Sequence, residues 1–201
     1  MARPRTFDEE RALDAAMRAF WRNGYEATST QELCEATGLG RSSIYNTFSS
    51  KRDLFLRALA RYADSKAALQ LALLEDGSVP PLERIRALFA AVVDGEFEER
   101  IGGRSIGCLT VNTVVEQAGR ADPEPEVVRL LERDLRRRLD ALRAVVAEGQ
   151  RDGSIATGRA PADVARYLNA VIGGMRVSAQ GGAGREVLES TAEIAVDALA
   201  R

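Results

Sequence analysis

Apolar positions recur along this chain at the three- and four-residue spacing of a helix that buries one face. The pattern extends over nearly the whole chain and is interrupted at glycine- and proline-containing breaks such as residues 76–81, 102–103 and 181–184. No stretch alternates apolar and polar residues as a half-buried strand would. The sequence therefore predicts an all-α protein, and the positions of the breaks predict about nine helices.

The ends of the expected helices are marked by local signals. Ser29 with Glu32, and Ser50 with Asp53, have the spacing of a capping box, in which a side chain at the helix start bonds to a backbone N–H three residues later. Glycine or proline marks several of the other ends. The expected helices lie at about 6–23, 29–37, 40–48, 51–75, 80–99, 105–118, 123–148, 161–180 and 185–200.

The segment from Ser29 to Lys51 contains two short helices joined by the turn Gly38-Leu39-Gly40. The second of these helices has a single charged residue, Arg41, and is otherwise rich in small hydrogen-bonding side chains. A helix-turn-helix protein inserts a short helix of this kind, entered through a sharp turn, into the major groove of DNA. The segment therefore predicts a DNA-binding head at the start of the chain.

The outward face of that second helix supplies the candidate DNA contacts. Ile44 and Phe48 are four residues apart, so both should face the core of the head, with Trp21 and Leu33. Arginine can bond two atoms of guanine and asparagine two atoms of adenine, while hydroxyl groups suit phosphates or mixed base edges. The candidate residues of this helix are Arg41, Ser42, Ser43, Tyr45, Asn46 and Thr47.

Lys51 starts the next helix, where the positive end of the helix dipole would add to its attraction for phosphate. Ordinary polar residues on a short surface helix would give a similar pattern, and such a face could also bind a partner protein. The distribution of charge favours nucleic acid slightly. Residues 1–62 hold ten Arg and Lys residues against eight Asp and Glu, and the remainder holds eighteen against twenty-two.

The composition argues against several kinds of catalysis. The chain has no histidine, which excludes Ser-His-Asp and Cys-His catalysis and every histidine-ligated metal site. Cys34 and Cys108 are far apart, so neither a disulfide framework nor a thiolate metal cluster is expected. The sequence shows no signal-peptide core and no apolar run of membrane length. We therefore expect a cytoplasmic protein that is not an enzyme and has neither metal nor cofactor.

Three motifs in the first quarter of the chain resemble the TetR family of one-component transcriptional repressors. They are A-x-x-x-F-x-x-x-G-Y at 16–25, T-x-x-x-[ILV]-x-x-x-x-G-[VL] at 29–39, where serine opens the motif and Thr30 follows, and [IL]-Y-x-x-F-x-[SN]-K-x-x-L at 44–54. The resemblance implies a helix-turn-helix DNA-binding domain at 1–50. It also implies a helical domain for effector binding and dimerisation at 51–201, whose first helix connects the two.

The resemblance also gives roles to single residues. It places Tyr45 and Lys51 at positions that contact phosphate, and the rest of the outward face of the second short helix at positions that meet bases and backbone. Two residues depart from the family pattern. Cys34 stands where alanine is usual, and Thr47 stands where histidine or tyrosine is frequent, which affects one phosphate or base contact. Near the start of the first short helix the resemblance adds two contacts to the flanking strand, Thr30 and Gln31.

Members of the family are dimers that pair their last two helices as a four-helix bundle. The last two expected helices of this chain carry apolar stripes, and Gly173-Gly174 would permit close approach of another helix. Periodicity indicates amphipathic helices, which suit either an interface or an intramolecular core. The candidate interface residues are Leu168, Val171, Ile172, Val187, Thr191, Ile194 and Ala198.

The resemblance further implies an effector cavity under the long helices of the body. In the expected sixth helix, Cys108, Asn112 and Glu116 recur four residues apart on a mostly apolar helix, where a buried amide needs a partner. A ligand could be that partner; alternatively, Asn112 bonds to a neighbouring backbone and Glu116 is solvated. Candidate apolar walls, each equally compatible with plain core, are Phe89, Val93, Leu139, Tyr167 and Met175.

The leading hypothesis is a homodimeric repressor that binds a palindromic double-stranded DNA operator and leaves it when an unknown small molecule fills the body. In a variant of this hypothesis Cys108 senses oxidants or electrophiles, with Arg104 one turn away to favour the thiolate. A buried cysteine acting as a small hydrophobe is the commoner case. Rival hypotheses are a helical ligand-binding enzyme and a protein adaptor. The sequence alone is compatible with both repression and activation of transcription.

Overall fold

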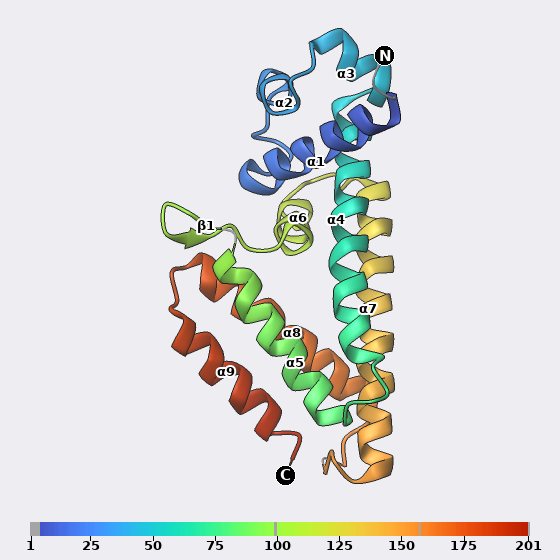
Figure 1. The fold of residues 1–201 in the computed structure, drawn as a ribbon, viewed down its shortest axis with the longest axis vertical. Helices are drawn as coiled ribbons and strands as arrows, with labels where there is room; N and C mark the ends of the chain where they lie inside the picture. The colour runs from blue at the N-terminus through green and yellow to red at the C-terminus, as the bar shows by residue number, and fades with distance from the viewer. Residues whose placement is uncertain (1–4, 99, 157, 201) are drawn as a thin grey trace. The chain divides into compact units, whose positions relative to one another are not determined.

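The computed structural model describes residues 5–98, 100–156 and 158–200. Over these residues the chain folds into nine helices and one two-stranded hairpin, which confirms the prediction of an all-α protein (Figure 1). None of the helices in these ranges is both long enough and apolar enough to cross a membrane. In chain order the elements are α1 (Arg5–Asn23), α2 (Thr30–Thr37), α3 (Arg41–Phe48), α4 (Lys51–Leu74), α5 (Pro81–Glu98), β1 (Arg100–Ile101), β2 (Arg104–Ser105), α6 (Leu109–Ala118), α7 (Pro125–Asp152), α8 (Pro161–Gln180) and α9 (Arg185–Asp197).

The short hairpin was not expected from the sequence. Residues 100–101 pair antiparallel with residues 104–105. Gly102 and Gly103 connect the two strands at φ angles of +57° and +80°, values that glycine adopts readily and other residues rarely do. Strands of two residues are too short to show an alternating pattern, and this is why the sequence did not indicate them.

The hairpin also shortens the sixth helix, which the sequence predicts from about residue 105. α6 begins only at Leu109, after the N-cap residue Cys108, because residues 104–105 are paired in β2 and residues 106–107 connect that strand to the helix. Between β2 and α6, Gly107 has a φ of +70°. The side chain of Gln180 fills the space beside it, and a Cβ at Gly107 would lie 2.3 Å from the nearest atom of that side chain. Backbone angle and space both favour glycine here.

The chain forms two compact units. The first comprises the residues up to 65 together with 108–131, so it contains α1, α2, α3, most of α4, α6 and the start of α7. The second comprises the described residues of 66–107 and 132–201. Compactness therefore groups α6 with the first three helices, although α3 ends at Phe48 and α6 begins only at Leu109. The functional boundary expected near residue 50 stays a prediction.

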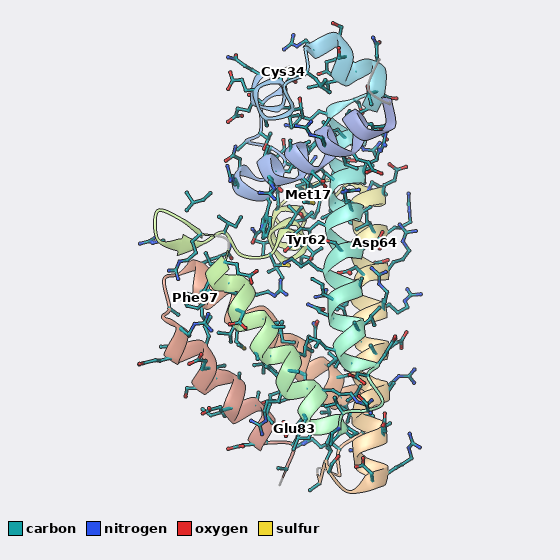
Figure 2. All side chains as sticks on the ribbon, in the orientation of Figure 1. Met17, Cys34, Tyr62, Asp64, Glu83 and Phe97 are labelled. Atoms are coloured by element: carbon teal, nitrogen blue, oxygen red, sulfur yellow. The ribbon has the colours of Figure 1, made fainter. Side chains whose placement is uncertain are left out.

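Aromatic side chains fill the core of the first unit. The rings of Phe20 and Phe55 meet edge to face with their centroids 5.1 Å apart, and those of Trp21 and Tyr62 do so at 4.9 Å. Tyr62 is labelled on α4 in Figure 2, and its side chain is almost completely buried. Ring pairs of this geometry contribute about 0.5–1.5 kcal/mol beyond the burial of their surface. They hold α1 against α4.

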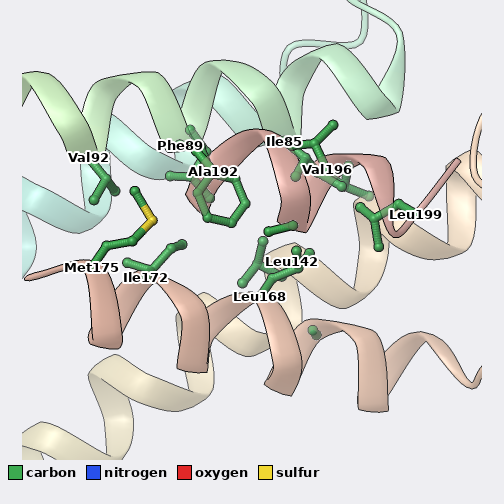
Figure 3. Close-up of a cluster of buried hydrophobic side chains, with 14 of the residues drawn as sticks. Ile85, Phe89, Val92, Leu142, Leu168, Ile172, Met175, Ala192, Val196 and Leu199 are labelled. Carbon is green, nitrogen blue, oxygen red and sulfur yellow. The ribbon is translucent and has the colours of Figure 1, made fainter. Parts of the chain in front are cut away.

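The second unit has a larger aliphatic core between α5, α7, α8 and α9 (Figure 3). Phe89 of α5 lies in it beside Ile172 and Met175 of α8 and Ala192 of α9. Burial of this apolar surface is the main favourable term in folding the unit.

An ion pair between a buried arginine and a partly exposed glutamate links α5 to α7 in the second unit. The side chain of Arg84 is 4% exposed, and its guanidinium donates to both carboxylate oxygens of Glu148, at 2.7 and 2.9 Å. It also donates to the carbonyl oxygen of Val79 at 2.6 Å. A buried guanidinium is tolerated only when it is paired in this way. The pair joins residues 64 positions apart, so no local spacing could have indicated it.

Candidate nucleic-acid interface

A capping box starts α2, as the sequence predicts. The Ser29 hydroxyl accepts a hydrogen bond from the Glu32 backbone N–H at 3.1 Å, and the Glu32 carboxylate accepts one from the Ser29 N–H at 2.6 Å. The bonds from the Ser29 backbone and side chain lower the pKa of Glu32 below its ordinary value, because they favour the carboxylate. The start of α2 is therefore fixed by two reciprocal bonds.

The turn between α2 and α3 has the geometry of a helix-turn-helix. Gly38 ends α2 in the left-handed conformation, with a φ of +69°, and its N–H donates to the carbonyl oxygen of Cys34 at 2.9 Å. Glycine suits this position because it has no Cβ to clash with the backbone. Gly40 then caps α3 with an extended backbone. Cys34 itself, labelled in Figure 2, is half-buried on α2.

The orientation of α3 matches the prediction. Ile44 is 1% exposed and Phe48 is fully buried, together with Leu33 of α2 and Trp21 of α1. The opposite face of α3 lies open, and the helix carries no acidic residue. The side chains predicted to contact DNA are exposed at Arg41, Ser42, Ser43, Tyr45 and Asn46, and half-buried at Thr47.

Two contacts organise the edge of this surface. The hydroxyl of Thr30, the first residue of α2, lies 3.2 Å from the Tyr45 hydroxyl of α3. The side-chain amide of Gln31 donates to Glu35 at 3.1 Å. Thr30 and Tyr45, which the family resemblance gives to the DNA backbone, thus stand side by side, with hydroxyl groups that suit phosphate oxygens.

Lys51 is positioned by the break between α3 and α4. Ser49 ends α3 with a φ of +58°, which is unusual for a residue other than glycine, and the Ser50 hydroxyl caps α4 by accepting from the Asp53 N–H at 3.0 Å. The Lys51 ammonium donates to the carbonyl oxygen of Glu26 at 3.4 Å and lies 4.5 Å from the centre of the Tyr25 ring. These partners, on the turn before α2, were not predicted.

The structure gives Glu116 a different role from the one expected. Its carboxylate accepts hydrogen bonds from the backbone N–H groups of Tyr25 and Glu26, at 3.3 and 3.0 Å. The side chain is half-buried, so the carboxylate is partly screened from solvent, and its role as an effector contact stays a prediction. Nothing in the spacing of α6 could indicate partners that lie 90 and 91 positions earlier in the chain.

The other candidate effector contacts fall in both units. Asn112 is half-buried on α6, and Cys108 is 2% exposed with its sulfur 3.0 Å from the Thr110 hydroxyl, both in the first unit. The burial of Cys108 agrees with a small hydrophobe better than with a reactive thiol. In the second unit Leu139 is half-buried and Tyr167 is exposed. The candidates that belong to the aliphatic core of the second unit are Phe89, Val93 and Met175.

The structure divides the candidate interface residues into two groups. Leu168 and Ile172 lie in the core of their own chain, so neither has much surface left for a partner, and we remove both from the candidates. α8 instead exposes Val177, which the sequence analysis missed because the stripe facing the core and the stripe facing outward are both apolar. The remaining candidates are exposed at Val187, Ile194 and Ala198 and half-buried at Val171 and Thr191.

Two family profiles match this chain. The profile described as "Bacterial regulatory proteins, tetR family" matches residues 12–58, and the one described as "Tetracyclin repressor-like, C-terminal domain" matches residues 81–193. The first covers most of α1, all of α2 and α3 and the beginning of α4, which together carry the surface described above.

The chain is also similar to known proteins over most of its length. It is 34% identical over 191 residues to the HTH-type transcriptional repressor ComR of Escherichia coli (strain K12), covering 92% of this chain and 86% of the relative. It is 35% identical over 174 residues to the uncharacterized HTH-type transcriptional regulator YezE of Bacillus subtilis (strain 168), covering 84% of each. A cysteine mutant of the TetR family regulator CifR, solved with 26-base-pair operator DNA, matches with a TM-score of 0.81 and 30% identity, over 98% of this chain and all of that one.

A helix-turn-helix with an open polar face, joined to a larger set of helices, defines a DNA-binding transcriptional regulator. The matches place it more narrowly: the chain belongs to the TetR family of bacterial regulatory proteins.

Proposed function

We propose that this protein is a repressor that binds a palindromic DNA operator as a homodimer and is released when a small molecule binds. The open polar face of α3, set on a buried Ile44 and Phe48, is the observation that carries the proposal. Relatives named as repressors, and a similar regulator solved with operator DNA, support it. The function requires binding and release of DNA, and no step of it requires catalysis.

Dimerisation through α8 and α9 is supported by an exposed apolar stripe. On α9, Val187 and Ile194 are 56% and 66% exposed, and they lie on the same face of the helix as Thr191 and Ala198. α8 adds the exposed Val177. An apolar stripe that follows one face of a helix favours a partner, and a second copy of the chain would present the same stripe in return. Two copies would carry two α3 helices, as a palindromic operator requires.

The effector site is proposed in a narrow cavity of the second unit, between the end of α4, α5, α7 and α8. Leucine and isoleucine side chains line most of it, and its polar groups come from Gln70, Arg138 and Asn169. One terminal nitrogen of Arg138 pairs with Asp134 at 3.2 Å, while its buried Nε finds no acceptor among the described residues. A mostly apolar molecule with a carboxylate or carbonyl oxygen would satisfy that nitrogen.

This cavity would have to widen to admit an effector. Its volume of about 10 Å³ is roughly that of one water molecule, whereas small-molecule sites occupy about 300 Å³ or more. Binding would therefore favour a conformation with α7 and α8 further apart. Release of DNA would follow if that conformation binds the operator less tightly. The physical link is a population shift, as expected for a regulator of this kind.

Selection from a random-sequence library tests the proposal. Duplexes enriched by the purified protein should contain two inverted half-sites about 10 base pairs apart, centre to centre, or a multiple of that spacing. Enrichment of a single half-site would contradict binding as a symmetric dimer. No enrichment over the starting library would contradict sequence-specific binding altogether.

A further inference from the structure

The turn between α1 and α2 is held by a carboxylate from a distant helix. Glu116 of α6 accepts hydrogen bonds from two successive backbone N–H groups, those of Tyr25 and Glu26, and its two oxygens lie 3.7 Å from where a Cβ of Gly24 would stand. Successive N–H groups that point the same way form an anion-binding site, and here the anion is a side chain of the same compact unit.

Two cations also contact the same turn. The Lys51 ammonium bonds to the Glu26 carbonyl oxygen at 3.4 Å and lies over the Tyr25 ring. Arg120, just beyond α6, pairs with the Glu26 carboxylate. The N–H, the carbonyl and the side chain of Glu26 are thus all engaged, by Glu116, Lys51 and Arg120 respectively.

This turn leads directly into the DNA-facing surface. Thr30, four residues after Glu26, begins α2 and meets Tyr45 of α3. Lys51 begins α4 and is the cation expected to bind phosphate. A change in the backbone of residues 25–26 would therefore move one partner of Lys51 and the start of α2 together.

We propose that Glu116 is a positioning residue for DNA binding. By fixing the Tyr25–Glu26 turn, it holds Lys51 and the start of α2 in the positions from which they contact the DNA backbone. The proposal rests on the proposed DNA-binding function and adds a residue that no motif of the head contains. Glu116 itself is half-buried, and the proposed role requires no contact between its side chain and DNA.

Simple electrostatics makes the opposite prediction, and this allows a sharp test. Removing a carboxylate from a DNA-binding unit reduces repulsion from phosphates, so a charge effect alone would strengthen binding. A positioning role predicts that Glu116→Ala and Glu116→Gln both weaken binding, since neither side chain can accept both turn N–H groups as a charged acceptor. The loss of two hydrogen bonds to a charged group should weaken affinity by about tenfold or more.

The experiment measures binding of each variant to a duplex selected by the wild-type protein, across a series of salt concentrations. Glu126→Gln is the matched control, because Glu126 lies in the same unit but pairs with the Arg52 side chain at 2.9 Å and not with the turn. The control should bind as tightly as wild type or slightly more tightly. If Glu116 acts through Lys51, Glu116→Ala and Lys51→Ala should each lower the salt slope by about one unit, and the double variant by no more than either alone.

A readout without DNA separates this proposal from the function on which it rests. Hydrogen exchange of the free protein at the Tyr25 and Glu26 amides should be slowest in the wild type and faster at one or both of them in Glu116→Gln, with other amides of α1 and α2 unchanged. If wild type binds no DNA, the proposed function fails whatever the variants do. If wild type binds DNA but both Glu116 variants match it in affinity and salt slope, the positioning role is wrong. Glu116→Gln keeps the test open should the alanine variant fail to fold.

Discussion

Individual residues of the candidate site could be predicted where a local spacing determines their orientation. Ile44 and Phe48 are one helical turn apart, so burying them leaves Arg41 and Asn46 outside, as the structure shows. The partners of Lys51 and Glu116 could not be predicted in this way. They lie 25 and about 90 positions away in sequence, and their approach depends on how helices pack in three dimensions.

At the scale of residues, Lys51→Ala should weaken binding to all DNA sequences alike. One phosphate contact fewer should lower the slope of log affinity against log salt by about one unit. Fluorescence anisotropy over a salt series measures both quantities. Lys66→Ala, the same change in the same helix beyond the DNA-facing surface, is the control and should bind like wild type. Equal slopes for the two variants would exclude Lys51 from the interface.

Arg41 and Asn46 should govern sequence choice more than overall affinity. Each can make a bidentate contact to one base, so its replacement by alanine should relax preference at one position and cost about 1–3 kcal/mol there. Selection from a random library reports this directly. Arg22→Ala, an exposed arginine in the last turn of α1, serves as control. Identical enriched sequences for wild type, Arg41→Ala and Asn46→Ala would mean that base reading lies elsewhere.

Glu32 should make the stability of the head depend on pH. Its pKa is lowered in the folded protein by the bonds from Ser29. The folded state therefore binds fewer protons than the unfolded state, and the stabilisation is fully present above the ordinary value of 4.5 and lost as pH falls through the lowered pKa. Wild type should accordingly exceed Glu32→Gln in unfolding free energy near neutral pH, and the difference should shrink in acid. A difference independent of pH would show that the capping box adds no charge-dependent stability.

At the scale of elements, the capping residues and chain breaks allowed most of the helices to be predicted from the sequence. Gly38, Ser29 and Ser50 act on their own neighbours, so their effect is visible in sequence. The hairpin at 100–105 was not predicted, because its strands are too short to show an alternating pattern of apolar and polar residues. α8 was misread for another reason: Leu168 and Val177 are both apolar, yet one belongs to the core and the other lies exposed. Composition does not distinguish these two faces.

The exposed stripe of α9 should hold the dimer together. Ile194→Lys places a charge at its centre and should shift the protein from dimer to monomer, because an unpaired charge in an apolar interface is costly. Analytical ultracentrifugation of the folded variant measures the change. Glu193→Lys adds the same side chain at the neighbouring exposed position outside the stripe and should stay dimeric. If Ile194→Lys remains a dimer of unchanged affinity, the interface does not use this face of α9.

At the scale of the whole molecule, one compact unit carries the helix-turn-helix, and the other carries the apolar stripe and the narrow cavity. The assignment to the TetR family agrees with each part, and the sequence motifs of the head were sufficient to suggest it. The effector site was the part of the protein that the sequence predicted least well. Phe89, Val93 and Met175 are apolar at helical spacing, as pocket walls and core residues both are; all three lie in the aliphatic core, and other residues line the narrow cavity.

The central claim is that this protein reads a DNA sequence through α3, and a comparison of two duplexes tests it most directly. Affinity is measured for the selected duplex and for one of the same composition in scrambled order, over a range of salt concentrations. We expect the protein to bind the selected duplex at least about 10³-fold more tightly than the scrambled one, with the affinity for both falling steeply as the salt concentration rises. Equal affinity for the two duplexes, or an affinity that does not respond to salt, would contradict it.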